Sequence, residues 1–207
     1  MKLLTLILLI SLIFISGCTI TGFFVKDSCS NETMPALKDD CYVKLAANTT
    51  NMDICKKIKD QRTVHYCYTE IAKKTNNATI CSLIENDPYW RDICFGSIAE
   101  STSDASLCFV IINENSKNKC FKTVALAKND SELCKPITNI TEKERCIYEI
   151  AKQTNNILIC SLLSTQLNQD TCLYKIAKNT QNSTICALIK INQIEQRCLN
   201  ITNSTNK

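Results

Sequence analysis

The chain contains very few of the residues that build phosphate loops and catalytic turns. Its 207 residues include three glycines, three prolines and a single histidine. A glycine-rich phosphate loop and a nucleophile elbow both need glycine at fixed positions, and neither pattern occurs in the sequence. Paired carboxylates in a catalytic arrangement are also absent. We therefore do not expect an enzyme, and no catalytic residue is predicted.

Closely spaced cysteine pairs are absent as well, although the chain has 15 cysteines. Zinc sites, iron–sulfur sites and dithiol redox catalysts use C-x-x-C pairs, and haem attachment uses C-x-x-C-H. The only histidine, His65, has no serine or acidic motif around it, so a surface or partly packed position is expected rather than a general base. We expect no metal and no cofactor.

Charge of one sign is nowhere concentrated. The net charge is +4, and lysines alternate with acidic residues along the chain. A nucleic-acid surface would need a basic block or a basic stripe with aromatic residues, and the sequence has neither. These residues are expected to form solvated helix faces, and no nucleic-acid partner is predicted.

What the chain does contain is a repeat marked by cysteine. A first set of cysteines recurs about every 26 residues, with one slightly longer step before Cys94, as expected of a tandem array. Its members are Cys41, Cys67, Cys94, Cys120, Cys146, Cys172 and Cys198. A second set precedes the first at a nearly constant shorter spacing: Cys29, Cys55, Cys81, Cys108, Cys134, Cys160 and Cys186. A fixed period of this kind is typical of solenoids.

Each repeat predicts a long helix and a short one. In the long stretch, Cys67, Ile71 and Ala72 share one helical face, and the same residue types recur after the other first-set cysteines. In the short stretch, Ile80 and Cys81 begin a second apolar stripe. We predict a helix of about three turns, a tight turn and a helix of about two turns. Isolated helices of this length are only marginally stable in water, so stacking and cross-links must hold them in place.

Residues that cap helices precede both stretches. Four residues before second-set cysteines stand Asn51, Asn77, Asp104, Asp130, Asn156 and Asn182. Seven residues before first-set cysteines stand Asp60, Asp87, Asn113, Asn139 and Thr165. Pro88 follows Asp87, and proline is favoured at the first helical position. The predicted fold is an all-α solenoid of about six short helix-turn-helix hairpins with a 26-residue repeat, over residues 41–198.

The fourteen cysteines of the repeat predict a disulfide framework in an exported chain. Pairing across the 12-residue gap leaves none over: Cys29–Cys41, Cys55–Cys67, Cys81–Cys94, Cys108–Cys120, Cys134–Cys146, Cys160–Cys172 and Cys186–Cys198. Pairing across the 14-residue gap leaves Cys29 and Cys198 unpaired, so the first scheme is favoured. Each bridge contributes about 3 kcal/mol on the loop-entropy model.

The N-terminal residues 1–25 have the charged start, apolar middle and small-residue end of a secretory signal. The ending Ile15-Ser16-Gly17-Cys18 resembles a bacterial lipobox, which predicts lipidation of Cys18. An uncleaved membrane anchor and simple cleavage remain alternatives, because residues 3–25 are long enough to span a bilayer. Residues 26–40 are expected to form a linker with a degenerate first half-repeat, and residues 199–207 a disordered tail.

Eight triplets fit the pattern for N-glycosylation, at Asn31, Asn48, Asn77, Asn129, Asn139, Asn182, Asn200 and Asn203. Four of them, Asn48, Asn77, Asn129 and Asn182, fall at the turn from the long to the short helix, which predicts a sugar-coated edge if the host glycosylates exported proteins. Asn77 and Asn182 are also expected helix caps, so structure alone explains these two equally well.

Tyr89 and Trp90 stand early in one expected long helix, directly after Pro88. Trp90 is the only tryptophan of the chain, and with Tyr89 it is able to form a small contact patch. Packing against the neighbouring hairpin is the favoured interpretation.

The repeat unit resembles tandem helical repeats of exported archaeal proteins. The pattern is C-x₁₁-C-[YFIL]-x-x-[ILV]-A-x₈-C, with Asn or Asp four residues before the last cysteine, and it covers residues 29–198. The architecture is also similar to Sel1-like and tetratricopeptide-type solenoids, although the repeat of this chain is shorter than their units. This resemblance implies stacked hairpins and carries over no binding residues.

We therefore expect an exported protein of the cell surface or envelope, anchored to the membrane through its N-terminus. The expected function is that of a non-enzymatic scaffold that binds a protein or glycan along the solenoid. A purely structural spacer without a ligand is the alternative, and thiol chemistry or metal handling is less favoured. Free or exchangeable cysteines would indicate thiol chemistry.

Overall fold

The computed structural model describes residues 28–203, and the predicted signal region with Cys18 lies outside the described residues. The chain divides into two compact units after residue 38, so η1 (Ser28–Asn31) belongs to the first and residues from Asp39 onward belong to the second. Every regular element between residues 28 and 203 is a helix. The prediction of an all-α repeat fold is confirmed.

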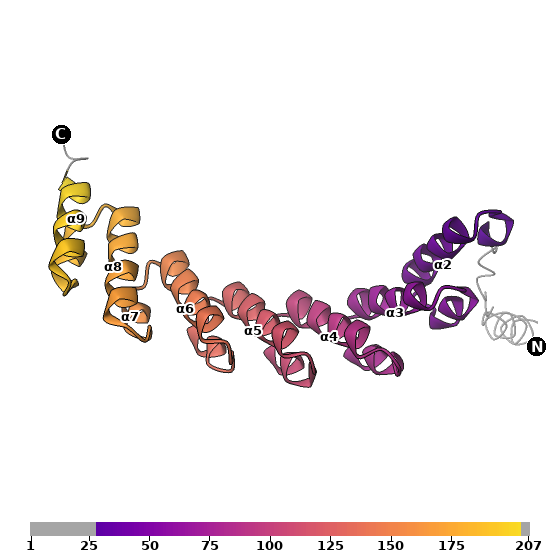
Figure 1. Ribbon diagram of the computed structural model, residues 1–207. Coiled ribbons are helices and arrows are strands. Elements are labelled where there is room, and N and C mark those ends of the chain that lie inside the picture. The colour runs from indigo at the N-terminus through magenta and orange to yellow at the C-terminus, as the bar shows by residue number, and fades with distance from the viewer. Residues whose placement is uncertain (1–27, 204–207) are drawn as a thin grey trace, which may run out of the picture. The chain divides into compact units, whose positions relative to one another are not determined.

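Long helices alternate with short helical segments (Figure 1). Six long helices have the same length: α2 (Pro35–Thr49), α3 (Gln61–Thr75), α4 (Pro88–Thr102), α5 (Glu114–Lys128), α6 (Ile140–Thr154) and α8 (Gln166–Thr180), and α9 (Asn192–Asn203) follows them. The short segments are η2 (Met52–Lys57), η3 (Ala78–Leu83), η4 (Ala105–Val110), η5 (Ser131–Cys134), α7 (Ile157–Cys160) and η6 (Ser183–Leu188). From α3 to α9, consecutive long helices contact each other, and each short segment packs against the long helix before it and the one after it.

The capping residues predicted for the long helices all cap them. Asp60, Asp87, Asn113, Asn139 and Thr165 each accept a hydrogen bond from the backbone N–H three residues on. Pro88 begins α4 as expected. Each of these helices ends at a left-handed residue with φ between 50° and 54°: Asn76, Ser103, Asn129, Asn155 and Gln181. Asparagine adopts this conformation more readily than serine or glutamine, so the turn back to the short segment strains the backbone at Ser103 and Gln181.

The short helices of about two turns that the sequence predicts are present, but most of them are not α-helices. Five of the six are 3₁₀ helices, and α7 is a single turn of α-helix. Their caps are those predicted, because the Asn or Asp before each segment accepts from the N–H two residues on. Backbone bonds such as Ile84 N–H to Cys81 O, at 3.2 Å, close the segments. A 3₁₀ helix rises about 2.0 Å per residue against about 1.5 Å in an α-helix, so each residue of a short segment covers more of the long helix beside it.

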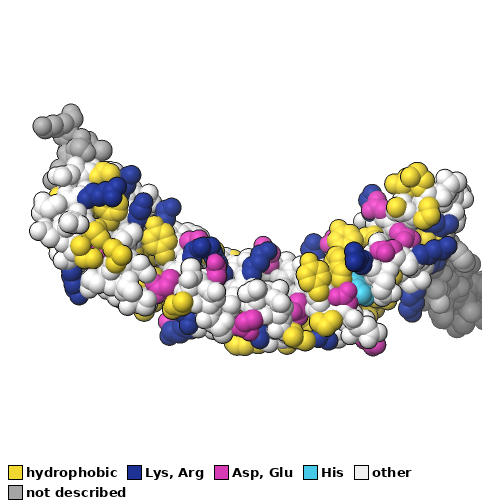
Figure 2. Space-filling view, viewed as in Figure 1, with side chains coloured by type: hydrophobic (Ala, Val, Ile, Leu, Met, Phe, Trp, Pro, Cys, Tyr) yellow, Lys and Arg dark blue, Asp and Glu magenta, His cyan; other side chains and the backbone are white. Residues whose placement is uncertain are grey.

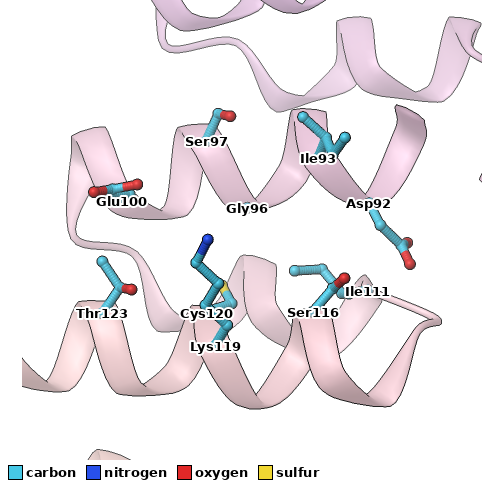
Figure 3. A pocket seen from close by; sticks show the side chains of 10 residues that line it. All are labelled: Asp92, Ile93, Gly96, Ser97, Glu100, Ile111, Ser116, Lys119, Cys120 and Thr123. Carbon is cyan, nitrogen blue, oxygen red and sulfur yellow. The ribbon is translucent and has the colours of Figure 1, made fainter. Parts of the chain in front are cut away.

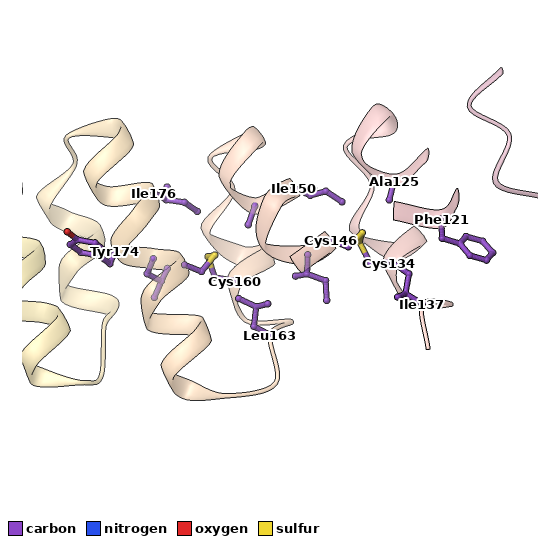
Figure 4. Packing of buried hydrophobic residues seen from close by; sticks show 14 of the residues in the cluster. Phe121, Ala125, Cys134, Ile137, Cys146, Ile150, Cys160, Leu163, Tyr174 and Ile176 are labelled. Carbon is purple, nitrogen blue, oxygen red and sulfur yellow. A yellow bond between two sulfur atoms is a disulfide. The ribbon is translucent and has the colours of Figure 1, made fainter. Parts of the chain in front are cut away.

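The core lies between the long helices and the short segments, and cystines occupy much of it (Figure 4). The apolar residue four positions after each first-set cysteine is buried at Ile71, Ile98, Val124, Ile150 and Ile176. The residue three positions after each second-set cysteine is buried at Ile58, Ile84, Ile111, Ile137, Leu163 and Ile189. The alanine stripe of the long helices is also buried, as the helical spacing predicts.

Six bridges connect each short segment to the next long helix: Cys55–Cys67, Cys81–Cys94, Cys108–Cys120, Cys134–Cys146, Cys160–Cys172 and Cys186–Cys198. Cys29 and Cys41 are disulfide-bonded too. The six described pairs follow the predicted scheme, with a separation of 13 only at Cys81–Cys94. Such a framework fits an oxidising, extracellular environment.

From α2 to α8, the side chain two residues before the first-set cysteine lies beside the next repeat, and it is buried at every one of these positions except Glu144. The Asp92 carboxylate of α4 accepts hydrogen bonds from the backbone N–H groups of Ile112 and Asn113, at 3.0 and 2.7 Å, just before α5 begins. The same arrangement recurs at Asp39 with Lys59 and Asp60, and at Asp170 with Lys190 and Ile191. We call these contacts the repeat ties.

Two repeats use a different acceptor for the same tie. Asn118 of α5 accepts from the Thr138 N–H at 3.1 Å, and Glu144 of α6 accepts from the Ser164 N–H at 2.8 Å. Each tie satisfies backbone donors that precede the N-terminus of the next long helix, where no intrahelical acceptor exists. The ties therefore orient one repeat on the next, in addition to the cystines.

The expected terminal boundaries differ in the structure. α2 begins at Pro35, within the residues 26–40 that were expected to hold a linker and a degenerate first half-repeat. α9 continues to Asn203, so the prediction of a disordered tail was wrong for residues 199–203. Thr202 explains the extension, because it is only 2 % exposed and its hydroxyl donates to Cys198 O at 3.0 Å.

Acid is expected to weaken the aspartate caps. Hydrogen bonds to Asp60 from the Thr63 side chain and backbone lower the pKa of Asp60 below its usual value of 3.8. A carboxyl with a lowered pKa stabilises the fold above its unfolded-state pKa, and this contribution is lost as the pH falls through the folded-state value. Asp60→Asn should therefore reduce the loss of thermal stability between neutral and acid solution while changing little at neutral pH, because asparagine caps α5 and α6. An unchanged pH profile of the melting temperature would contradict this expectation.

Candidate functional site

His65 is more deeply buried than expected. The side chain was predicted at the surface or partly packed, but the residue is only 6 % exposed. It stands at the tie position of α3, and its Nδ1 lies 3.6 Å from Oδ2 of Asp87, the N-cap of α4. Its Nε2 lies 2.9 Å from Nε2 of Gln61, whereas Nδ1 is buried without a hydrogen-bond partner. His65 therefore occupies the tie position of α3 and packs beside the cap of α4, but it does not form the backbone hydrogen bonds of a tie.

The turns from long helix to short segment form an edge of polar side chains, which we call the polar edge. Its residues are Asn76, Asn77, Ser103, Asp104, Asn129, Asp130, Asn155, Asn156, Gln181 and Asn182. The triplets at Asn77, Asn129 and Asn182 lie on it, and Asn48 lies in the last turn of α2; all four are exposed. Asn31, Asn139 and Asn200 are exposed elsewhere, and the side chain of Asn203 lies outside the described residues.

The opposite edge carries exposed apolar side chains. Nine of the fourteen large hydrophobic residues exposed in the described chain lie at the ends of short segments, in the connections after them or in the first two residues of long helices. We call this set the apolar edge: Leu83, Tyr89, Phe109, Val110, Ile112, Ile140, Leu162, Leu167 and Leu188. Sequence reasoning missed it, because six of these nine residues stand directly beside a buried residue in the chain, which masks the pattern.

The repeat position of these residues shows that they are not part of the core. Leu83, Val110, Leu162 and Leu188 each stand two residues after a second-set cysteine, and they are between 47 % and 52 % exposed. The residue after each one is buried instead. Phe109 is 63 % exposed and meets the buried Phe121 edge-on, with ring centroids 4.8 Å apart. Exposed apolar groups gathered on one edge mark interaction surfaces more often than single ones do.

Tyr89 and Trp90 differ in burial. Tyr89 is 67 % exposed and belongs to the apolar edge, whereas Trp90 is half-buried. Their rings meet edge-on with centroids 6.1 Å apart. Trp90 is therefore partly packed, as expected for the pair. The ring of Tyr89 is instead largely exposed to solvent.

A groove opens between α4 and α5 (Figure 3). Its volume is about 180 Å³, and it is lined by Asp92, Ile93, Gly96, Ser97, Glu100, Ile111, Ser116, Lys119, Cys120 and Thr123. Lys119 extends from α5 toward Gly96 of α4. Ile111 and Cys120 contribute apolar surface, and the remaining walls are mostly hydroxyl and charged groups.

The corresponding grooves of the next two repeats contain larger side chains. Between α5 and α6, Lys122 takes the place of Gly96 and lies 3.6 and 3.5 Å from carboxylate oxygens of Glu142 and Glu149. Between α6 and α8, Tyr148 takes that place, and partial burial raises the pKa of its phenol. The groove at Gly96 is therefore distinct in having no side chain at this position.

Charged side chains of both signs are interspersed on the face shown in Figure 2, as the sequence predicts. Within residues 28–203, no helix is long and apolar enough to cross a bilayer, and no group of three or more His, Cys, Asp or Glu side chains is placed to hold a metal ion.

No protein-family model, curated protein or solved structure matches the chain. The resemblance to exported archaeal repeats stays a prediction.

Proposed function

We propose that the protein is a non-enzymatic extracytoplasmic scaffold that binds a partner protein along its apolar edge and is held at the membrane by its N-terminal segment. The apolar edge carries this proposal. A spacer without a ligand gains nothing from exposing an apolar side chain at the same position of four repeats, since such surface promotes unwanted association.

The partner's chemistry is inferred from charge. The apolar edge between α3 and α5 includes residues 82–90 and 109–116, which contain Glu85, Asp87 and Glu114 and no lysine or arginine. An anionic lipid surface would be repelled there. A protein segment with apolar and basic side chains complements this stretch, and Tyr89 and Phe109 supply aromatic anchors of the kind that dominate interfaces.

The rigidity of the repeat array supports the same function. Each described repeat from η2 onward has a buried cystine, and buried ties connect successive long helices. A preorganised surface loses less conformational entropy when it binds than a flexible one does.

A photo-reactive amino acid placed at Val110 or Leu162 of the full chain tests the proposal in the native host. We expect one discrete cross-linked protein from both positions and none from Lys152 or Lys178, which lie in the last turns of α6 and α8 near the polar edge. The cross-linked protein should then be identified, purified and titrated against the scaffold. Equal labelling from both edges, or no labelling from either, would favour a spacer.

The double variant Val110→Ser/Leu162→Ser is expected to lose partner binding by at least about tenfold, because truncating exposed apolar anchors removes interface contacts. Both residues are about half exposed in the free chain, so the thermal unfolding midpoint should hardly change. The matched control is Lys152→Ser/Lys178→Ser, which should bind like the native chain. Unaltered affinity of the Val110→Ser/Leu162→Ser chain would contradict the proposed edge.

A further inference from the structure

The short helix α7 carries an exposed leucine where the other repeats carry polar residues. Two residues before each second-set cysteine, the cap needs only a backbone N–H, and Leu158 donates its N–H to Asn156 at 3.0 Å. The equivalent residues in the other repeats from η2 onward are all polar: Asp53, Thr79, Ser106, Glu132 and Thr184. Leu158 is 76 % exposed, more than any other large hydrophobic residue that the structure describes. Neither capping nor core packing therefore accounts for a leucine here.

Leu158 lines a hollow of about 220 Å³ between α7, α8 and the end of η6. Leu188, which is 52 % exposed, and the half-buried Ile157 line it as well. Four other repeats have only alanine or serine at the position of Ile157: Ala78, Ala105, Ser131 and Ser183. Leu188 belongs to the apolar edge, so the hollow continues that edge onto α7.

The polar groups around the hollow are mostly engaged within the protein. Gln166 Nε2 donates to Asp170 at 2.8 Å, and Gln169 Nε2 donates to Leu163 O at 2.8 Å. The Lys190 ammonium has no hydrogen bond or ion pair within residues 28–203. Lys190 is also the only charged residue of the lining that the structure describes. An occupant therefore meets exposed apolar surface with one unpaired cation beside it.

The size and chemistry of the hollow limit what it can hold. Its volume is below the roughly 300 Å³ of sites for drug-sized ligands, which favours a single side chain. A free anion would meet one ammonium among apolar side chains. A polar side chain would leave its own hydrogen-bonding groups unpaired against that surface, which costs free energy. A bulky apolar side chain fills the hollow, and a carboxylate next to it pairs with Lys190.

We propose that the α7–α8 hollow is an anchor site for the protein partner of the apolar edge, and that it takes a bulky apolar side chain beside an aspartate or glutamate. This inference rests on the proposed function and adds a specificity to it. The stretch of the edge between α3 and α5 carries acidic residues only, whereas the hollow carries Lys190. A partner that spans both therefore lies along the edge in one direction, because charge complementarity fixes the register.

Selection of phage-displayed random peptides on the oxidised full chain tests the site without the native partner. We expect the enriched peptides to share a large apolar residue beside Asp or Glu. They should shift the backbone amide resonances of Leu158, Leu188 and Lys190 in a saturable way. Added salt should weaken this binding, because the pair of carboxylate and ammonium is partly exposed. Enriched peptides without such a residue pair, or no enrichment at all, would overturn the proposal.

Leu158→Thr should weaken binding of the enriched peptides by at least about tenfold, because it removes an anchor contact. Threonine occupies the equivalent position at Thr79 and Thr184, so the thermal unfolding midpoint should hardly change. Lys190→Gln should weaken binding severalfold and make it insensitive to salt, whereas Lys190→Arg should bind like the native chain. The matched control is Lys178→Gln, in the last turn of α8, which should not alter binding. Native-like binding by Leu158→Thr or by Lys190→Gln would contradict the anchor site.

Cross-linking in the native host separates this inference from the proposed function. A photo-reactive amino acid at Leu158 should label the same protein as one at Val110, whereas one at Thr79 should label none. Labelling from Val110 without labelling from Leu158 would overturn the anchor site and leave the proposed function standing. Binding of phosphatidylglycerol vesicles that is lost in Leu158→Thr would also overturn it, because the hollow would then be a lipid contact.

Discussion

Replacing Cys134 and Cys146 together with alanine is expected to lower the free energy of unfolding by about 3 kcal/mol or more, because the bridge closes a short loop. Both sulfurs are also fully buried in the core (Figure 4), so their removal leaves a cavity in addition. Denaturant titration, followed by hydrogen exchange read by mass spectrometry, measures the effect and its location.

The loss should be local, because each repeat contacts only its neighbours. Amides of α5, η5 and α6 should exchange faster, while those of α3 and α9 keep their protection. The matched control removes Cys186 and Cys198, whose bridge has the same separation of 12 but holds the terminal α9. That variant should release α9 and leave the inner repeats protected. Uniform loss of protection along the chain in the Cys134/Cys146 variant would contradict a nearest-neighbour array.

Asp170→Ala is expected to destabilise the chain by about 2–4 kcal/mol, because it leaves two backbone donors without an acceptor. Asp170 is fully buried and accepts from the N–H groups of Lys190 and Ile191 at 3.1 and 2.7 Å. Gln166 Nε2 donates to its other oxygen at 2.8 Å. Thermal and denaturant unfolding measure the loss.

Two matched variants separate the tie from general effects of the substitution. Asp170→Asn should cost less than Asp170→Ala, because an amide oxygen serves the same tie at Asn118. Asp40→Ala removes an exposed carboxylate that pairs with Lys44 on the surface, and it should change stability little. Equal effects of Asp170→Ala and Asp40→Ala would show that the ties do not hold the repeats together.

The periodic features of the fold were predictable because local sequence determines them. A capping residue needs only its own helix, and all eleven predicted caps act as caps. The cysteine register limits which pairs can form, and the apolar residues at fixed spacing from each cysteine are buried as expected. The 3₁₀ form of the short segments was missed, because apolar spacing over so short a stretch does not separate it from an α-helix.

The ties and the candidate sites depend on contacts between repeats, which the sequence does not display. Asp92 and Asp170 recur two residues before a cysteine, and this signal was readable, but their partners are backbone groups 20 and 21 residues away. The burial of His65 was missed because its neighbour Asp87 belongs to the next repeat. The α4–α5 groove lies between helices of two successive repeats, and only their packing shows it.

Peptide mapping of the oxidised protein under non-reducing conditions tests most directly that each repeat is covalently fixed to the next, on which both edges and the α4–α5 groove depend. The structure predicts linked peptides that join Cys55 to Cys67, Cys81 to Cys94 and so on at the 12- or 13-residue spacing, with no free thiol among residues 28–203. Peptides that link Cys67 to Cys81, or free thiols in the repeats, would contradict it.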